Sequence, residues 1–303
     1  MVAILGPTAT GKSGLAMRLA DRLDGEIVNA DALQAYRGLD VGTAKPSIVD
    51  RQRVPHHLID ILDPDEVYSA GEFARRARAA IEEIRGRGRL PLVVGGSGLY
   101  LRALLEGISP LPPKDPQTRH HLDERLAEEG LPALARQLAE LDPDAAERLS
   151  ATDSQRVLRA LEVALSTGKP LSEWQRERPF GSRRLAAVRI GLTLPRAILY
   201  DRIDDRVGSM VRSGWVDEVR GLLHQGWQPS ARAFQAIGYR QLVQHVQRQA
   251  PLDECVEDIR RATRRYAKRQ ETWFRKERDI AWFAAEQPDE LAAVVVRFLA
   301  TEI

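Results

Sequence analysis

The stretch from Gly6 to Ser13 reads GPTATGKS and stands between an apolar run, Val2–Leu5, and a segment with helical spacing, Ser13–Leu23. It fits the pattern G-x-x-x-x-G-K-[ST] in the strand–loop–helix context that a P-loop requires. Glycines let backbone N–H groups turn toward a ligand, Lys12 adds a cation, and the helix N-terminus favours anions. The Ser13 hydroxyl can hold Mg²⁺. We therefore predict a diphosphate or nucleotide site formed by Gly6, Pro7, Thr8, Ala9, Thr10, Gly11, Lys12 and Ser13.

Strands and helices alternate beyond this loop. Glu26–Asn29 and Leu90–Val94 are apolar and read as strands, whereas Phe73–Arg85 has apolar positions at helical spacing. Ala186–Leu194 alternates like a further strand, and the segments after it read as helices up to the C-terminus. This order predicts an α/β fold, namely a P-loop NTPase-like parallel sheet with helices on both faces.

Clustered prolines in SPLPPKDP, Ser109–Pro116, interrupt this alternation, because proline cannot continue a helix or a central strand. The segments from Gln117 to about Arg178 then all read as helices. We predict an all-helical insertion domain at 113–182 within a catalytic core domain made of 1–112 and 183–303. Its flanks, Pro110–Pro116 and Pro179–Gly181, have the composition of hinges about which the insertion should move.

The overall composition describes a globular protein. The chain has 303 residues, 43% of them hydrophobic, which is enough to bury a sizeable core. Because no run of about 18 apolar residues occurs and the N-terminus lacks the features of a signal peptide, we expect a cytoplasmic protein without membrane contact. The single cysteine, Cys255, excludes an intramolecular disulfide and a cysteine-based zinc site. We expect a monomer.

Asp31 follows the second predicted strand directly, in EIVNADALQAY. Its carboxylate should therefore lie at the carboxyl edge of the sheet, where open α/β sheets bind ligands. This place suits a general base or a group that orients a substrate, and it suits a helix N-cap equally well. The strand that an NTP-hydrolysing enzyme would end in aspartate ends instead in Gly95-Gly96-Ser97-Gly98, and no guanine-recognition NKxD motif is present.

A basic segment lies near the C-terminus, although the net charge of the chain is only +2. Between Arg260 and Arg278 there are two acidic residues and nine basic ones: Arg260, Arg261, Arg264, Arg265, Lys268, Arg269, Arg275, Lys276 and Arg278. Two sets recur every four residues, so a helix would carry two rows of cations that repel one another. A polyanion relieves that repulsion, and Tyr266, Trp273 and Phe274 offer stacking surfaces, which favours RNA as the partner.

Eight short blocks occur in the order found in tRNA dimethylallyltransferases, also called tRNA isopentenyltransferases. They are GPTATGKS (6–13), NADALQAY (29–36), VGTAKP (41–46), PHHLID (55–60), GGSGLYLRAL (95–104), QRVLRALEV (155–163), GYRQL (238–242) and KRQETWFR (268–275). The chain thus resembles this family from residue 1 to about 275. The P-loop reflects only a superfamily, whereas PHHLID with GGSGLY is specific to the family.

The resemblance implies transfer of a dimethylallyl group from dimethylallyl diphosphate to the N6 amine of the adenosine immediately 3′ of the anticodon. The acceptors would be tRNAs that read codons beginning with U. The cofactor would be Mg²⁺. Asp31, Thr8 and Arg206 match the catalytic residues of the family: Asp31 accepts from the amine, Thr8 contacts substrate, and Arg206 holds the diphosphate. The implied contacts with the tRNA anticodon stem-loop are Asp31, Ala32, Leu33, Gln34, Ser97, Arg119, Gln155, Arg156, Val157, Leu158, Arg159, Gln235, Ala236, Ile237, Gly238, Tyr239, Arg240, Lys268, Arg269, Gln270, Glu271, Thr272, Trp273, Phe274 and Arg275.

Other functions fit parts of this pattern. A P-loop kinase of a small metabolite would use Asp31 to orient a hydroxyl, and an isopentenyltransferase could act on free adenine nucleotides. A nucleotide-gated RNA-binding module without catalysis is a third alternative. His56 and His57 are adjacent and lack a ligand cluster, so Pro55–Asp60 reads as a strand or loop that closes the cleft, with one histidine hydrogen-bonded inside. Trp174, Trp215 and Trp227 read as packing residues.

Overall fold

The computed structural model describes residues 1–108, 111–177, 184–286 and 288–302. The chain forms two compact units, Met1–Leu105 with Leu185–Ile303, and Glu106–Arg184. The second unit extends a few residues beyond the insertion predicted at 113–182. Of the predicted hinges, Pro110 and Pro179–Gly181 lie outside the described residues.

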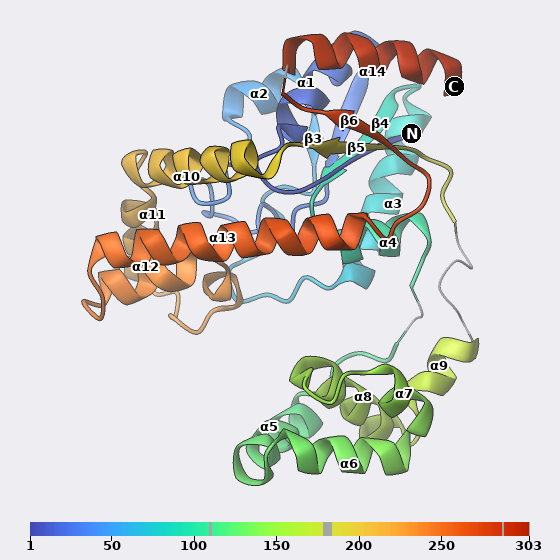
Figure 1. The fold of residues 1–303 in the computed structure, drawn as a ribbon, viewed down its shortest axis with the longest axis vertical. Coiled ribbons are helices and arrows are strands. Elements are labelled where there is room, and N and C mark those ends of the chain that lie inside the picture. The colour runs from blue at the N-terminus through green and yellow to red at the C-terminus, as the bar shows by residue number, and fades with distance from the viewer. Residues whose placement is uncertain (109–110, 178–183, 287, 303) are drawn as a thin grey trace. The chain divides into compact units, whose positions relative to one another are not determined.

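The first unit contains a six-stranded sheet in the order β3-β2-β4-β1-β5-β6, and all its neighbouring strands are parallel (Figure 1). The strands are β1 (Val2–Leu5), β2 (Gly25–Asn29), β3 (His56–His57), β4 (Leu90–Gly95), β5 (Val188–Thr193) and β6 (Ile280–Ala284). This sheet confirms the predicted α/β class. β1 and β2 are buried at every position, so the sheet needs cover on both faces.

β6 corrects the sequence-based expectation of helices alone after Ala186–Leu194. Ile280–Ala284 is a partly exposed edge strand, and its backbone pairs with β5 from Arg189↔Ile280 onward. The segment reads IAWFA, a short apolar run whose periodicity alone does not distinguish a strand from a helix segment. Pairing with β5, which is distant in sequence, is what makes this segment a strand.

Helices cover the two faces of the sheet, with α1 and α14 on one side and α3 and α4 on the other (Figure 1). Helices α10 to α13 pack against one another beyond the carboxyl ends of the strands. The helices of this unit are α1 (Lys12–Leu23), α2 (Ile48–Arg53), α3 (Ala70–Gly86), α4 (Gly98–Leu105), α10 (Arg196–Arg212), α11 (Trp215–His224), the 3₁₀ helix η1 (Arg232–Gln235), α12 (Tyr239–Val246), α13 (Leu252–Phe274) and α14 (Pro288–Glu302).

The strand order places a ligand crevice beside β1. The chain runs from β1 to β2 and β3 on one side, and later to β5 and β6 on the other. Where the connections that follow two strands lead to opposite sides of such a sheet, a crevice forms at its carboxyl edge. The loop between β1 and α1, which contains GPTATGKS, lies at this switch point.

The second unit is helical and consists of α5 (Pro116–Glu129), α6 (Leu131–Leu141), α7 (Pro143–Arg148), α8 (Ser154–Thr167) and α9 (Leu171–Glu177). Asp115, Asp142 and Asp153 cap the starts of α5, α7 and α8 by accepting backbone N–H groups. Its core is its own, built around Leu122, Leu138 and Leu161. Within the described residues, no helix of the chain is both long and apolar enough to cross a membrane.

The tryptophans differ in their surroundings. Trp215 is buried between two glycines, because a Cβ on Gly42 or Gly238 would lie about 2 Å from its indole ring, at 1.9 Å and 2.0 Å respectively. Trp174 packs against the core of the helical unit. Trp227 lines a shallow surface pocket beside Arg232, so it is less enclosed than a core residue.

Candidate active site

The loop from Gly6 to Ser13 is held in one conformation by its glycines and by an internal carbonyl. Gly6 has φ 139°, and a Cβ there would approach the Leu192 carbonyl oxygen of β5 to 2.6 Å. Gly11 has φ 88° and precedes α1, whose first turn receives no side-chain cap. The free N–H groups of that turn therefore remain available to an anion.

Pro7 closes the loop from within. Its carbonyl oxygen accepts hydrogen bonds from the Thr10 hydroxyl at 2.9 Å and from the Lys12 ammonium at 2.5 Å. Thr10 is fully buried, whereas Ser13 is exposed at the start of α1. The loop thus keeps a rigid backbone and presents Lys12 and Ser13 at its open side.

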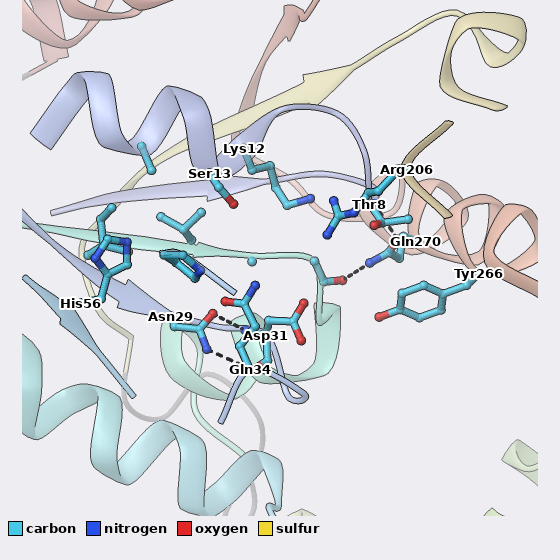
Figure 2. A pocket seen from close by; sticks show the side chains of 16 residues that line it. Thr8, Lys12, Ser13, Asn29, Asp31, Gln34, His56, Arg206, Tyr266 and Gln270 are labelled. Carbon is cyan, nitrogen blue, oxygen red and sulfur yellow. Dashed lines mark hydrogen bonds between the residues drawn. The ribbon is translucent and has the colours of Figure 1, made fainter. Parts of the chain in front are cut away.

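A pocket opens beside this loop at the carboxyl edge of the sheet, and residues from seven separate segments line it (Figure 2). They are Thr8, Lys12, Ser13, Ala16, Ile27, Asn29, Asp31, Gln34, Pro46, His56, Val94, Gly95, Gly96, Arg206, Tyr266 and Gln270. The structure therefore brings together the three predicted catalytic residues, Thr8, Asp31 and Arg206.

The pocket carries an excess of positive charge. Lys12 and Arg206 both line it, and in the described part of the chain neither forms an ion pair. Among the described residues, the one hydrogen-bond partner of the Arg206 guanidinium is the Thr43 carbonyl oxygen, at 3.5 Å. Asp31 is the one carboxylate among the lining residues. Two unpaired cations opposite one carboxylate suit an anion that carries several charges.

Burial lowers the pKa of Lys12 to about 7; the Arg206 guanidinium lowers it further, and the Asp31 carboxylate opposes the shift. Burial likewise lowers the pKa of Arg206, again opposed by Asp31. A bound polyphosphate would supply the negative charge that both cations lack. The pocket is therefore poised to bind an anion.

Asp31 is held by the turn that it begins. Its Oδ1 accepts the Leu33 N–H at 2.9 Å, while the Asn29 side chain accepts the Asp31 N–H and donates to the Asp31 carbonyl oxygen, both at 3.1 Å. Among the described residues, no hydrogen bond uses the second carboxylate oxygen, Oδ2. The alternative of a helix N-cap is wrong, because a turn follows and the next helix begins only at Ile48.

Helix α13 contributes two side chains to the pocket, one turn apart. Burial, with a contribution from the Asp31 carboxylate, raises the pKa of the Tyr266 hydroxyl to about 12, and a hydrogen bond with Ser97 opposes this. Sequence reasoning assigned Tyr266 to a stacking surface and missed its place in the pocket. The available signal was its spacing: Tyr266 and Gln270 are uncharged and lie four residues apart between the basic rows.

The glycines of GGSGLY are explained by close packing. A Cβ on Gly95 would lie 2.4 Å from the Ala30 carbonyl oxygen, and one on Gly96 would lie 2.3 Å from Nε2 of Gln270. A Cβ on Gly98 would collide with the indole of Trp273, also at 2.3 Å. This motif lets the end of β4 approach both the segment after β2 and helix α13.

The two adjacent histidines have different hydrogen-bond partners. His57 shares a hydrogen bond of 2.7 Å with the buried Glu26 carboxylate of β2. His56 lines the pocket, bonds the Val54 carbonyl oxygen at 2.7 Å, and has its pKa lowered by burial. Over the described ranges, no group of three or more His, Cys, Asp or Glu side chains is placed to hold a metal ion.

The residues that the resemblance assigns to tRNA contact occupy both units. Arg119 on α5 and Gln155–Arg159 on α8 belong to the helical unit, where Val157 and Leu158 are buried in the core. Gln235–Arg240 and Lys268–Arg275 belong to the first unit. There the side chains of Tyr239, Gln270 and Phe274 are buried, so their observed contacts are within the protein.

Carboxylates pair with Arg260 and Arg264 of one row and with Arg261 of the other, which corrects the expected face of two free cationic rows on helix α13. Arg264 pairs with Asp204 of α10 at 2.6 Å, and Arg260 pairs with Glu257 one turn earlier. Arg265 and Lys268 are exposed and, in the described part of the chain, form no ion pair. The sequence alone could not show that α10 would present an acidic residue to one of the two rows.

The sheet order, the glycine loop at the switch point and the cationic pocket together define a P-loop-like α/β protein with a positively charged pocket at the carboxyl edge of its sheet. Residues 34–277 match the family described as IPP transferase, and residues 1–60 match isopentenyl transferase. The tRNA dimethylallyltransferase of Syntrophobacter fumaroxidans is 48% identical over 98% of this chain and 87% of its own length. That of Geobacter sulfurreducens is 47% identical over 98% and 96%.

Solved structures agree in fold. The full-length tRNA isopentenylpyrophosphate transferase of Bacillus halodurans matches with a TM-score of 0.72 and 39% identity, covering 99% of this chain and 95% of that one. A eukaryotic dimethylallyltransferase acting on tRNA matches with a TM-score of 0.79 and 28% identity, covering 99% and 79%. The chain belongs to the family of tRNA dimethylallyltransferases.

Proposed function

We propose that this enzyme transfers the dimethylallyl group of dimethylallyl diphosphate to the N6 amine of the adenosine immediately 3′ of the anticodon. The product is N6-isopentenyladenosine, in tRNAs that read codons beginning with U. The observation that carries this proposal is the arrangement of Asp31 opposite Lys12 and Arg206 in one pocket (Figure 2). It provides an acceptor for a proton and a cradle for a departing diphosphate.

In the proposed reaction, the N6 lone pair attacks C1 of the dimethylallyl group while the bond from C1 to the diphosphate oxygen breaks. The diphosphate leaves with that electron pair, and the N6 proton passes to Oδ2 of Asp31. An exocyclic adenine amine is a weak nucleophile, because its lone pair is delocalised into the ring. A carboxylate that accepts from it as positive charge develops is therefore worth most in the transition state.

Lys12 and Arg206 stabilise the negative charge that grows on the leaving diphosphate, together with the free N–H groups at the start of α1. The Ser13 hydroxyl is exposed beside these groups and, within the described ranges, has no hydrogen bond of its own. That donor set suits Mg²⁺, which prefers substrate phosphates, water and few protein ligands. When bound, the ion would be held by Ser13 and would neutralise diphosphate charge.

The acceptor base must leave its stack to enter the pocket, as enzymes that act on bases require. Arg265 and Lys268 on α13 would attract the phosphates around it. We propose that Arg119 and Gln155–Arg159 of the helical unit also contact the anticodon stem-loop. We further propose that the enzyme acts as a monomer in the cytoplasm.

The test is a turnover assay with dimethylallyl diphosphate, Mg²⁺ and a synthetic anticodon stem-loop, read by mass spectrometry of digested nucleosides. We expect one C₅H₈ unit on the adenosine 3′ of the anticodon. A stem-loop with guanosine at that position is the matched control and should gain nothing. Modification of free adenosine monophosphate in place of the stem-loop, or phosphorylation of a small acceptor by ATP, would contradict the proposal and support one of the alternatives.

A further inference from the structure

Gln270 connects helix α13, through its buried side chain, to the loop from Gly6 to Ser13, which we call the phosphate loop. Its Oε1 accepts the backbone N–H of Thr8 at 2.9 Å, and its Nε2 donates to the Gly96 carbonyl oxygen at 2.9 Å. The side chain is only 6% exposed. A single amide therefore joins the phosphate loop, the end of β4 and α13 (Figure 2).

The orientation of this amide is fixed by its neighbours. An N–H group can only donate and a carbonyl oxygen can only accept, so Oε1 must face Thr8 and Nε2 must face Gly96. The approach is close, since a Cβ on Gly96 would come within 2.3 Å of Nε2.

This contact changes what Thr8 can do. Its backbone N–H is engaged by Gln270 and so is not directed at the ligand, unlike the N–H groups at the start of α1. The Thr8 side chain still lines the pocket that contains Asp31. Gln270 therefore holds the backbone of a residue whose side chain lines the pocket.

Gln270 lies in a stretch of α13 whose neighbouring basic residues face solvent. Lys268 and Arg269 directly precede it and are exposed, whereas Gln270 itself is turned inward. The helix thus presents Lys268 and Arg269 on its exposed side. On its buried side, Gln270 forms the hydrogen bond to the phosphate loop. Gln270 thus links the exposed basic part of α13 to the Thr8 backbone through a hydrogen bond.

We propose that Gln270 is a positioning residue that couples RNA contact on α13 to the placement of Thr8 for transfer. The inference rests on the proposed function, because it takes RNA as the polyanion. It assigns to Gln270 a role inside the protein rather than a direct contact with RNA. Removing the amide should impair the chemical step and spare the binding of either substrate.

The test uses Gln270→Met, which keeps the side-chain length and removes both hydrogen bonds. We expect the single-turnover rate at saturating substrates to fall by about 10- to 100-fold, because small misplacements of reacting groups cost rates of that order. The dissociation constants of dimethylallyl diphosphate and of the anticodon stem-loop should change by no more than about threefold. Gln270→Glu, which keeps the acceptor but places an oxygen against the Gly96 carbonyl, should behave similarly if the first variant does not fold.

Gln241→Met is the matched control. Gln241 is also a buried glutamine, 6% exposed, and accepts the Gly238 N–H at 2.9 Å, but it does not line the pocket. It should lose a similar amount of thermal stability while its single-turnover rate stays within about twofold of the parent. This comparison separates a general loss of packing from a loss of positioning.

A double-mutant cycle with Thr8→Ala tests whether Gln270 acts through Thr8. If Gln270 acts through Thr8, adding Gln270→Met to Thr8→Ala should slow the reaction by less than about threefold. Additive effects, or a single-turnover rate of Gln270→Met equal to that of the parent, would overturn the inference. Failure of the parent enzyme to prenylate the stem-loop would instead overturn the proposed function, so the two failures are distinguishable.

Discussion

The Oδ1 of Asp31 holds the turn, whereas its Oδ2, which forms no hydrogen bond in the described part of the chain, is the atom that we propose to face the substrate. We predict that Asp31→Asn lowers kcat by about 10²-fold or more, since an amide cannot take the proton of the amine. Donor and RNA binding should change little, because this interaction is strongest in the transition state. Single-turnover kinetics with saturating substrates measure the effect.

A comparison with Asp31→Ala tests whether Oδ1 of Asp31 stabilises the turn. The asparagine keeps an oxygen for the Leu33 N–H, so its melting temperature should match that of the parent. The alanine should lose turnover to the same extent and some stability besides. Near-normal turnover of Asp31→Asn would show that Asp31 only holds the turn.

Lys12 makes donor binding depend on pH. Its pKa is lowered to about 7 in the free enzyme by burial and by Arg206, and the diphosphate should raise it again. At about pH 8 the free ammonium is largely deprotonated, so binding should take up close to one proton. Affinity should therefore weaken as pH rises above 7. Calorimetry in buffers of different ionisation enthalpy measures this uptake, and persistence of the uptake in Lys12→Met would assign it to another group.

At the scale of elements, α13 carries some cations that are ion-paired within the protein and others that form no ion pair in the described part of the chain. Replacing Arg265 and Lys268 together with alanine should weaken RNA binding and reduce the slope of log K against log salt by about 1 to 2, because two phosphate contacts are lost. Binding of dimethylallyl diphosphate should be unaffected. Filter binding of the stem-loop over a salt series gives the slope.

The paired cations of α13 supply a control with the same change in charge. Arg260→Ala with Arg264→Ala removes the ion pairs to Glu257 and Asp204, so this variant should lose thermal stability. Its salt slope should stay near that of the parent, because the removed cations are paired within the protein. Equal slopes in the two double variants would exclude a specific role for Arg265 and Lys268.

At the scale of the whole molecule, the two units have separate cores. Leu161 is fully buried in the core of the helical unit, so Leu161→Ala should destabilise that unit by about 2 to 5 kcal/mol. The pocket residues all belong to the other unit, and dimethylallyl diphosphate should bind with unchanged affinity. Hydrogen exchange should accelerate within 106–184 only. Accelerated exchange around the phosphate loop would show that the units unfold together.

Much of this architecture could be predicted from the sequence because its causes are local. A strand, a glycine loop and a helix within the first 23 residues predict the proposed phosphate site, and alternating periodicities predict the α/β class. Asp31 could be placed at the carboxyl edge because it directly follows a strand. The eight ordered blocks identified the family without any coordinates.

Only the tertiary structure decided which distant residues meet. It made Ile280–Ala284 a strand by pairing it with β5, and it paired Arg264 with Asp204 across 60 positions of sequence. It placed Gln270 against Thr8, which is 262 positions away. Periodicity reports the face on which a side chain lies but not its partner. Partners across such separations are chosen when the sheet and helices pack, and they determine how the phosphate loop, Asp31 and α13 form one site.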